Sequence, residues 1–380
     1  MARMMPINKI KPFLAAFLIV IGAMAAPFPA GAQIRLFGGG LSFNLVDADA
    51  LFPEYAADPY SMSSGLKHLT MMDYGSVPQS ILASDGAEYV KIPFASYAES
   101  DFANRSSFWQ IKGFVNLSFA RIEIKDIFAA EVTTDGGINS VFQAFGGTDT
   151  LGFDGIWRLA ATVRLLDTVS LRYGMHHFSG HWGDEIVEDL PQPGDADYIP
   201  YNNLEEYVRA SSYVFGVSVN PEPWARLYFE AELPMEECWL RPGVHVPAGL
   251  TSPSGDDLAY HILNQEGLLE EVLAYGAGYR AWRLQAGAEF RLAFGDWGSI
   301  FAAGDFQLHQ DGQTLHQVGG YDPANPWEFE YTVGGGVEYS KGFLGRKLRV
   351  EAFYHDGRFP LTNFFFQRSR YVSVGLAINN

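Results

Sequence analysis

The sequence predicts an all-β protein, a transmembrane antiparallel β-barrel of about twelve strands with long extracellular loops. Three observations predict this fold: segments in which apolar and polar residues alternate, connections that alternate between short and long, and charges of both signs on the polar face. Aromatic residues make up 15% of the chain and glycines number 40, which suits a barrel with aromatic girdles and tight turns. Counts of ten or fourteen strands remain compatible with the pattern.

The alternation is clearest in residues 282–292. Trp282, Leu284 and Phe290 share one face of this segment, whereas Arg283 and Glu289 share the other. Successive side chains of a strand point to opposite faces, so such a segment has one apolar and one polar side. The same alternation recurs, less purely in places, in residues 156–165, 169–181, 207–219, 225–233, 299–309, 327–339, 347–355 and 370–378.

The connections distinguish a membrane barrel from a soluble β-sandwich, which would show the same alternation. Tight connections are expected at 166–168, 220–223, 295–296 and 342–345, and long ones at 182–203, 235–278, 310–326 and 358–368. Short periplasmic turns and long outer loops are typical of outer-membrane barrels. Mid-strand charges of both signs suit a closed polar lumen better than a sandwich face open to water; examples are Arg158, Arg172, Arg283, Glu230 and Glu289.

The N-terminus predicts export. Residues 1–32 combine a basic start, an apolar stretch too short to span a bilayer comfortably and a small-residue site, so we expect a signal peptide cleaved after Ala32, with an uncleaved anchor as the alternative. Residues 33–86 lack clean alternation and are expected to form an arm or a plug. Residues 87–380 are expected to form the barrel, in the bacterial outer membrane.

The charge balance excludes some partners. The chain carries a formal charge of −18. The only charged residues of the signal peptide are basic, so its cleavage would make the net charge more negative. This balance argues against nucleic acid, which requires a basic patch. The single Cys238 excludes an internal disulfide bond. Outer-membrane lipids and lipopolysaccharide are therefore the expected partners, and the oligomeric state is left open.

One group of residues suggests chemistry. His177, Ser179 and His181 have odd numbers, as do the apolar residues before them, which are Val169, Leu171, Tyr173 and Met175. Alternate residues of a strand share a face, so we expect the three polar residues on the lipid-facing side near the outer rim. Asn203 and Glu205 share the outer surface on the returning strand. A histidine that removes the serine proton, oriented by a carboxylate or an amide, activates a nucleophile. A polar ring at a barrel rim without catalysis explains the same residues.

The pair His177-x-Ser179 resembles the active sites of outer-membrane phospholipase A and of the lipid A deacylase barrels. By that resemblance His177 is the base, Ser179 the nucleophile, and Glu205 or Asn203 the orienting residue. Two features depart from those families: Gly180-His181 follows the serine where Asn-Gly is usual, and the connection to the third residue is longer than in the phospholipase.

A second resemblance covers nearly the whole mature chain. The run His177-x-Ser179-x-His181-x-Gly183-Asp184-Glu185, with Leu51-Phe52 and Ala57-Asp58-Pro59, is similar to an outer-membrane family of unassigned activity, domain-of-unknown-function family 1207. This resemblance implies a barrel and leaves the function open.

The connection after this run is acidic. From Trp182 to Glu206 inclusive, there are eight carboxylates and no Lys or Arg. Asp184 and Glu185 are the candidate ligands for Ca²⁺ or Mg²⁺ in this connection. The spacing fits no dedicated calcium motif. Three functions remain: a non-catalytic surface or envelope barrel as the default, a lipid acyl hydrolase that uses His177 and Ser179, and a narrow diffusion channel. About twelve strands enclose a narrow lumen, which argues against the channel.

Overall fold

The structure is a computed structural model that describes residues 33–36, 40–47, 50–73, 80–82, 88–91, 107–144, 150–183, 209–235, 282–310, 327–339, 347–362 and 368–379. These residues form sixteen strands: β1 Gln33–Leu36, β2 Leu41–Asp47, β3 Ser64–Asp73, β4 Ser80–Leu82, β5 Glu88–Lys91, β6 Ser107–Ile124, β7 Phe128–Gln143, β8 Thr150–Leu165, β9 Val169–Trp182, β10 Arg209–Glu222, β11 Ala225–Pro234, β12 Arg283–Ala293, β13 Gly298–His309, β14 Glu328–Tyr339, β15 Lys347–Arg358 and β16 Arg368–Asn379. Among the described residues, no helix is long and apolar enough to cross a membrane.

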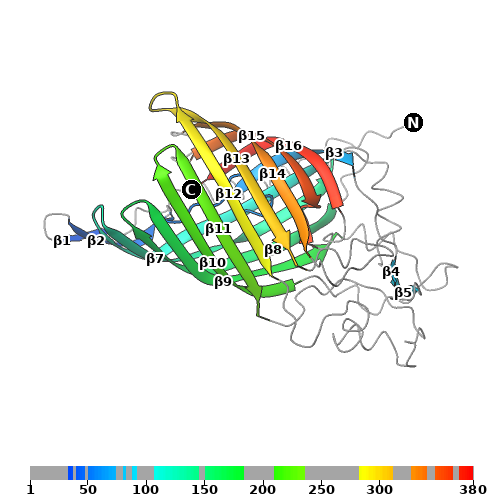
Figure 1. The fold of residues 1–380 in the computed structure, drawn as a ribbon, viewed down its shortest axis with the longest axis horizontal. Helices are drawn as coiled ribbons and strands as arrows, with labels where there is room; N and C mark the ends of the chain where they lie inside the picture. Colours follow the sequence, from blue (N-terminus) through cyan, green and yellow to red (C-terminus); the bar gives the residue numbers. More distant parts are fainter. Residues whose placement is uncertain are drawn as a thin grey trace, which may run out of the picture.

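Twelve of these strands close an antiparallel barrel. Each strand from β6 to β16 pairs with the next along the chain, and β3 joins β16 to β6. The closure is visible in the register, where Tyr371 of β16 lies opposite Met71 and Lys112 of β6 lies opposite Gly65. The predicted all-β barrel of about twelve strands is confirmed (Figure 1). Its first strand, β3, lies N-terminal to residue 87, where we expected the barrel to begin.

The long strand β6 has two different partners along one edge. Residues 107–112 pair with β3, whereas residues 118–124 pair with β2, which forms a hairpin with β1. This hairpin lies at the end of the barrel that carries the short turns (Figure 1). One of these turns, at 166–168, holds Leu166 and Asp167 at positive φ. Short turns are typical of the periplasmic end of an outer-membrane barrel, so we expect the opposite end to face outward.

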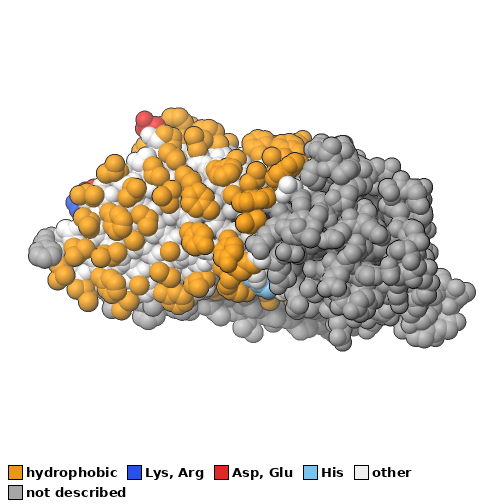
Figure 2. Space-filling model, turned by 60° about the horizontal axis from the view of Figure 1, so that its bottom comes forward, with side chains coloured by type: hydrophobic (Ala, Val, Ile, Leu, Met, Phe, Trp, Pro, Cys, Tyr) orange, Lys and Arg blue, Asp and Glu red, His pale blue; other side chains and the backbone are white. Residues whose placement is uncertain are grey.

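Apolar side chains cover the outside of the barrel and polar side chains fill its inside. On β11, Leu227 and Phe229 are 48% and 43% exposed, whereas Arg226 and Glu230 are each 5% exposed. Figure 2 shows hydrophobic side chains across the described barrel wall in that view. A soluble sandwich would bury its apolar face and expose its charges. The observed arrangement is that of a barrel in lipid, in which ring closure satisfies the backbone hydrogen bonds.

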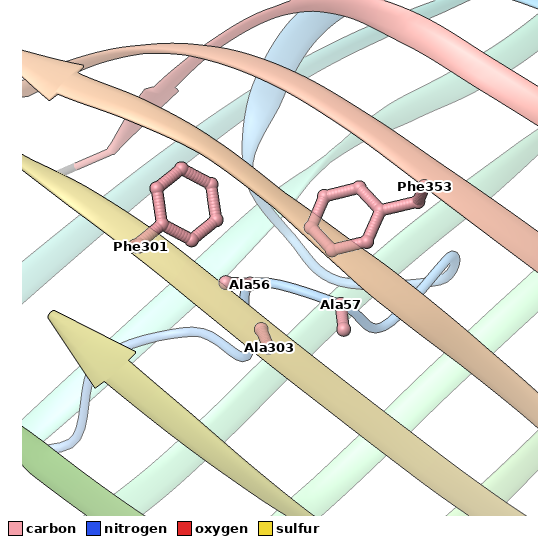
Figure 3. Close-up of a cluster of buried hydrophobic side chains, with 5 residues drawn as sticks. All are labelled: Ala56, Ala57, Phe301, Ala303 and Phe353. Atoms are coloured by element: carbon pink, nitrogen blue, oxygen red, sulfur yellow. The ribbon is translucent and has the colours of Figure 1, made fainter.

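The lumen is occupied by residues 50–63, which we call the lumen segment. Figure 3 shows Ala56 and Ala57 of this segment between strands of the barrel, next to Phe301, Ala303 and Phe353, with which they form a buried cluster. The segment enters directly before β3.

Charged side chains of the wall bind the backbone of the lumen segment. The amide of Leu51 donates to Glu131 Oε1 at 2.6 Å, and Arg226 Nη2 donates to the carbonyl oxygen of Pro53 at 2.7 Å. The amide of Ala56 likewise donates to Glu289 Oε1 at 2.8 Å, and Lys112 Nζ donates to the carbonyl oxygen of Pro59 at 3.1 Å. These bonds to charged groups satisfy backbone groups that would otherwise be buried without partners.

A second, shorter segment enters the lumen after β15. Phe359 and Leu361 are buried, and Asn139 Nδ2 donates to the carbonyl oxygen of Pro360 at 2.8 Å. Thr362 Oγ1 donates to Asp154 Oδ1 at 2.6 Å. The barrel therefore holds two inserted pieces of its own chain.

Candidate functional site

The candidate catalytic residues lie on the outward face of β9. His177, Ser179 and His181 are half-buried, whereas the intervening Phe178 is buried inside the barrel. The same outward face carries Tyr173, which is 58% exposed. These residues lie near the end of β9 that is opposite the turn at 166–168. They therefore lie on the apolar outer surface of the barrel, at the end opposite the short turns.

Ser179 is paired with the histidine that follows it. Ser179 Oγ lies 3.2 Å from His181 Nε2, within hydrogen-bond distance. Alternate residues of a strand point the same way, and the longer imidazole reaches back to the hydroxyl. A neutral imidazole that accepts this proton is the arrangement that activates a serine nucleophile.

His177, the residue predicted to be the base, is bonded to a different serine. His177 Nδ1 lies 2.9 Å from Ser211 Oγ on β10, which is its register partner. The structure thus gives His177 a cross-strand partner and gives Ser179 the other histidine of the motif. Sequence reasoning missed Ser211 and mentioned His181 only as part of the motif. We call His177, Ser179, His181 and Ser211 the rim site.

Aromatic rings of β8 lie against both histidines of the rim site. The rings of Phe153 and His181 stack with centroids 4.6 Å apart and planes 13° apart. The rings of Trp157 and His177 lie 5.7 Å apart at 30°. These contacts restrict the rotation of each imidazole and hold the histidines at the lipid-facing surface.

The remaining predicted site residues lie outside the residues that the structure describes. They are Asn203 and Glu205, the candidate orienting residues, and Asp184 and Glu185, the candidate ligands of Ca²⁺ or Mg²⁺. Within the described ranges, no group of three or more His, Cys, Asp or Glu side chains is arranged to hold a metal ion.

Inside the barrel, Glu54 of the lumen segment is the centre of a charge network. Its carboxylate pairs with Arg158 of β8 and lies 3.6 Å from Arg172 of β9. Arg172 also pairs with Glu230 of β11. Burial alone would raise the pKa of Glu54, but the two arginines outweigh it and hold that pKa at about 2. The sequence indicated the charges of the strands but not this carboxylate that joins them.

A cavity of about 70 Å³ lies between the two inserted segments. Tyr55 and Met62 line it from the lumen segment, Thr362 from the segment after β15, and Arg172 and His176 from β9. A water needs roughly 10–15 Å³ of such space, so the cavity has room for a few waters and does not form a wide bore.

Comparison with solved structures returns outer-membrane barrels. The chain is similar to outer-membrane phospholipase A from Escherichia coli, with 11% identity, a TM-score of 0.40 and coverage of 84% of this chain and 92% of that one. It is also similar to the calcium-bound outer-membrane phospholipase dimer from Salmonella typhi, with 10% identity, a TM-score of 0.40 and coverage of 84% of this chain and 91% of that one. For the translocator domain of autotransporter NalP from Neisseria meningitidis, the identity is 10%, the TM-score is 0.32, and the match covers 97% of this chain and 95% of that one. At such identities and scores, no activity transfers from these proteins.

No family model matches the sequence, and no curated protein matches it. The resemblance to domain-of-unknown-function family 1207 is therefore not confirmed.

Proposed function

We propose that this protein is an outer-membrane lipid acyl hydrolase in which Ser179 is the nucleophile and His181 is the base. The observation that carries the proposal is the 3.2 Å separation of Ser179 Oγ and His181 Nε2 on a lipid-facing surface. A polar pair in this position meets the ester groups of membrane lipids, which lie where the apolar band of a barrel ends.

The reaction follows from this pair. His181 Nε2 takes the proton of Ser179 Oγ as the oxygen attacks the ester carbonyl carbon, and a tetrahedral intermediate forms. The C–O bond to the lipid alcohol then breaks, and the imidazolium returns its proton to the leaving alkoxide. Water, deprotonated by the same imidazole, attacks the acyl–enzyme, and fatty acid and free Ser179 result. Glu205 or Asn203, which the sequence assigned to the orientation of His177, would here orient the imidazole of His181.

Fatty-acid release tests the proposal. Detergent-solubilised protein is mixed with phospholipid or lipid A and Ca²⁺, because Asp184 and Glu185 are candidate cation ligands. We expect Ser179→Ala to abolish release, whereas Ser211→Ala, a matched loss of one hydroxyl from the same surface, retains most of it. Equal inactivity of the wild type and Ser179→Ala on both lipid classes would overturn the proposal and leave a non-catalytic envelope barrel.

The filled lumen supports this proposal over a diffusion channel. The lumen segment is held by Glu131, Arg226 and Glu289, which belong to different parts of the wall. An aqueous channel would require these bonds to break. Little steady conductance is therefore expected from the purified protein in planar bilayers, and a stable ohmic pore would instead favour the channel.

A further inference from the structure

Ser179 is open to the lipid on one side because its neighbour on β8 has no side chain. Gly155 is the register partner of Ser179, and a Cβ atom on Gly155 would lie 3.3 Å from Ser179 Oγ. Among the described residues beyond its chain neighbours, only Ser179 has heavy atoms within 4 Å of that Cβ position. Glycine weakens the interior of a strand, and its presence there often marks a bulge, a tight bend, or the close approach of a ligand or of another backbone.

The residues that flank Gly155 on the same face are large and point elsewhere. Phe153 and Trp157 are 36% and 39% exposed, and their rings lie against His181 and His177. Phe153 and Trp157 are four residues apart, so about 13 Å of strand separates their Cα atoms, with Gly155 in the middle. The outer face of β8 is therefore bulky on both sides of a notch one residue wide.

The notch continues onto an apolar surface. On the edge of β8 away from β9, Gly155 pairs with Ile138 of β7, whose side chain is 50% exposed on the lipid-facing side. Adjacent strands lie about 4.8 Å apart, so the path from Ser179 over Gly155 to Ile138 runs roughly 10 Å across the wall. Its polar end holds the hydroxyl and its other end is apolar, which matches the carbonyl and alkyl parts of an acyl ester.

We infer that Gly155 forms the floor of an acyl-chain slot, in which the chain bonded to the reacting carbonyl lies across β8 and ends on Ile138. This inference rests on the proposed function, because the slot leads to Ser179. The slot selects long unbranched acyl chains, since only these reach Ile138 between the two rings. Gly155 is thus a specificity-determining residue.

The test fills the slot without adding polarity. Gly155→Leu places an apolar side chain on a lipid-facing surface, so heat-modifiable migration should stay that of the wild type. Gly304→Leu is the matched control: Gly304 lies on the outward face of β13, where a Cβ would meet its nearest neighbours at an ordinary 3.6 Å. Hydrolysis is measured with a long-chain phospholipid and with a short acetyl ester. A second readout is photo-crosslinking to vesicles of phospholipid that carries a diazirine on the acyl chain.

We expect Gly155→Leu to lower kcat/KM for the long-chain substrate at least about tenfold, to change acetyl-ester hydrolysis far less, and to lose the crosslink to β7–β9. Gly304→Leu should match the wild type throughout. Undiminished long-chain hydrolysis by Gly155→Leu would overturn the slot and leave the hydrolase intact. An inert wild type whose crosslink disappears in Gly155→Leu would overturn the hydrolase and keep the slot as a lipid-binding site. An inert wild type whose crosslink persists in Gly155→Leu would overturn both.

Discussion

Glu54 in the lumen segment forms an ion pair with Arg158 on the inner face of β8. The same carboxylate lies 3.6 Å from Arg172, so one acidic residue of the inserted segment interacts with two arginines of the wall. The side chains of Arg158 and Arg172 are 7% and 3% exposed. Without Glu54 these buried cations would keep fewer counter-charges, so Glu54 is an electrostatic attachment of the segment to the barrel.

Glu54→Ala should loosen the lumen segment. Removal of one partner of a buried ion pair costs about 3–5 kcal/mol when the other charge is left uncompensated, and the cost is smaller here because Arg158 keeps Asp135 and Arg172 keeps Glu230. We expect the barrel to unfold on gels at a lower temperature and the planar-bilayer conductance to rise. Asp296→Ala, which removes an exposed carboxylate from the turn before β13, is the control. Identical melting and conductance for the two variants would contradict the role given to Glu54.

The attachment should also respond to acid. The pKa of Glu54 is about 2 in the folded protein, against an ordinary value of 4.5. A carboxyl whose pKa is depressed by folding contributes stability that is complete above its unfolded value and is lost as the pH falls through the folded value. The contribution of Glu54 to the attachment should therefore be constant above about pH 5 and be lost between about pH 4.5 and 2, so conductance should rise in that interval. Glu54→Gln should remove this rise. A change in conductance near neutral pH that persists in Glu54→Gln would mean that the titration of another group governs conductance.

The alternation of side chains predicted the nine strands β8 to β16 but did not delimit β6 and β7, and it missed the first strand, β3. On β12, Arg283 is buried and Leu284 faces outward, as the sequence indicated. On β3, in contrast, Leu69 and Met71 point inward and are buried. Apolar residues that fill the lumen beside the inserted segments reverse the usual polarity of a membrane strand. Such a strand has no alternation signal to find.

The rim site was predicted only in part, and the reason is register. Parity alone places His177, Ser179 and His181 on one outward face. Which serine each histidine meets depends on the pairing of β9 with β10, which sets Ser211 opposite His177. That pairing is a long-range property of the barrel. The role inferred for Gly155 likewise depends on its register with Ser179, which the sequence alone does not give.

The orientation of the barrel is testable with single cysteines. In a Cys238→Ser background, Asp296→Cys places a thiol in the short turn between β12 and β13, and Met235→Cys places one directly after β11, at the opposite end. A membrane-impermeant maleimide should label Met235→Cys on intact cells, and Asp296→Cys only after the outer membrane is permeabilised. The reverse pattern would invert the barrel and move the rim site to the periplasmic side.

The last prediction separates the two histidines of the rim site. His181 Nε2 lies 3.2 Å from Ser179 Oγ, whereas His177 Nδ1 is bonded to Ser211. If this pairing holds during the reaction, His181→Ala should reduce fatty-acid release as severely as Ser179→Ala, because each removes half of one catalytic pair. The double variant should then be no worse than either single variant.

His177→Ala should cost less, since it removes only a cross-strand bond and the contact with Trp157. A fluorophosphonate that labels activated serines gives a second measurement: labelling should disappear in His181→Ala and persist in His177→Ala. Retention of the label by the wild type and loss in both variants would mean that the two histidines act together. Loss in His177→Ala alone would restore the assignment first suggested by the sequence, and it would require His177 to leave Ser211 when substrate binds.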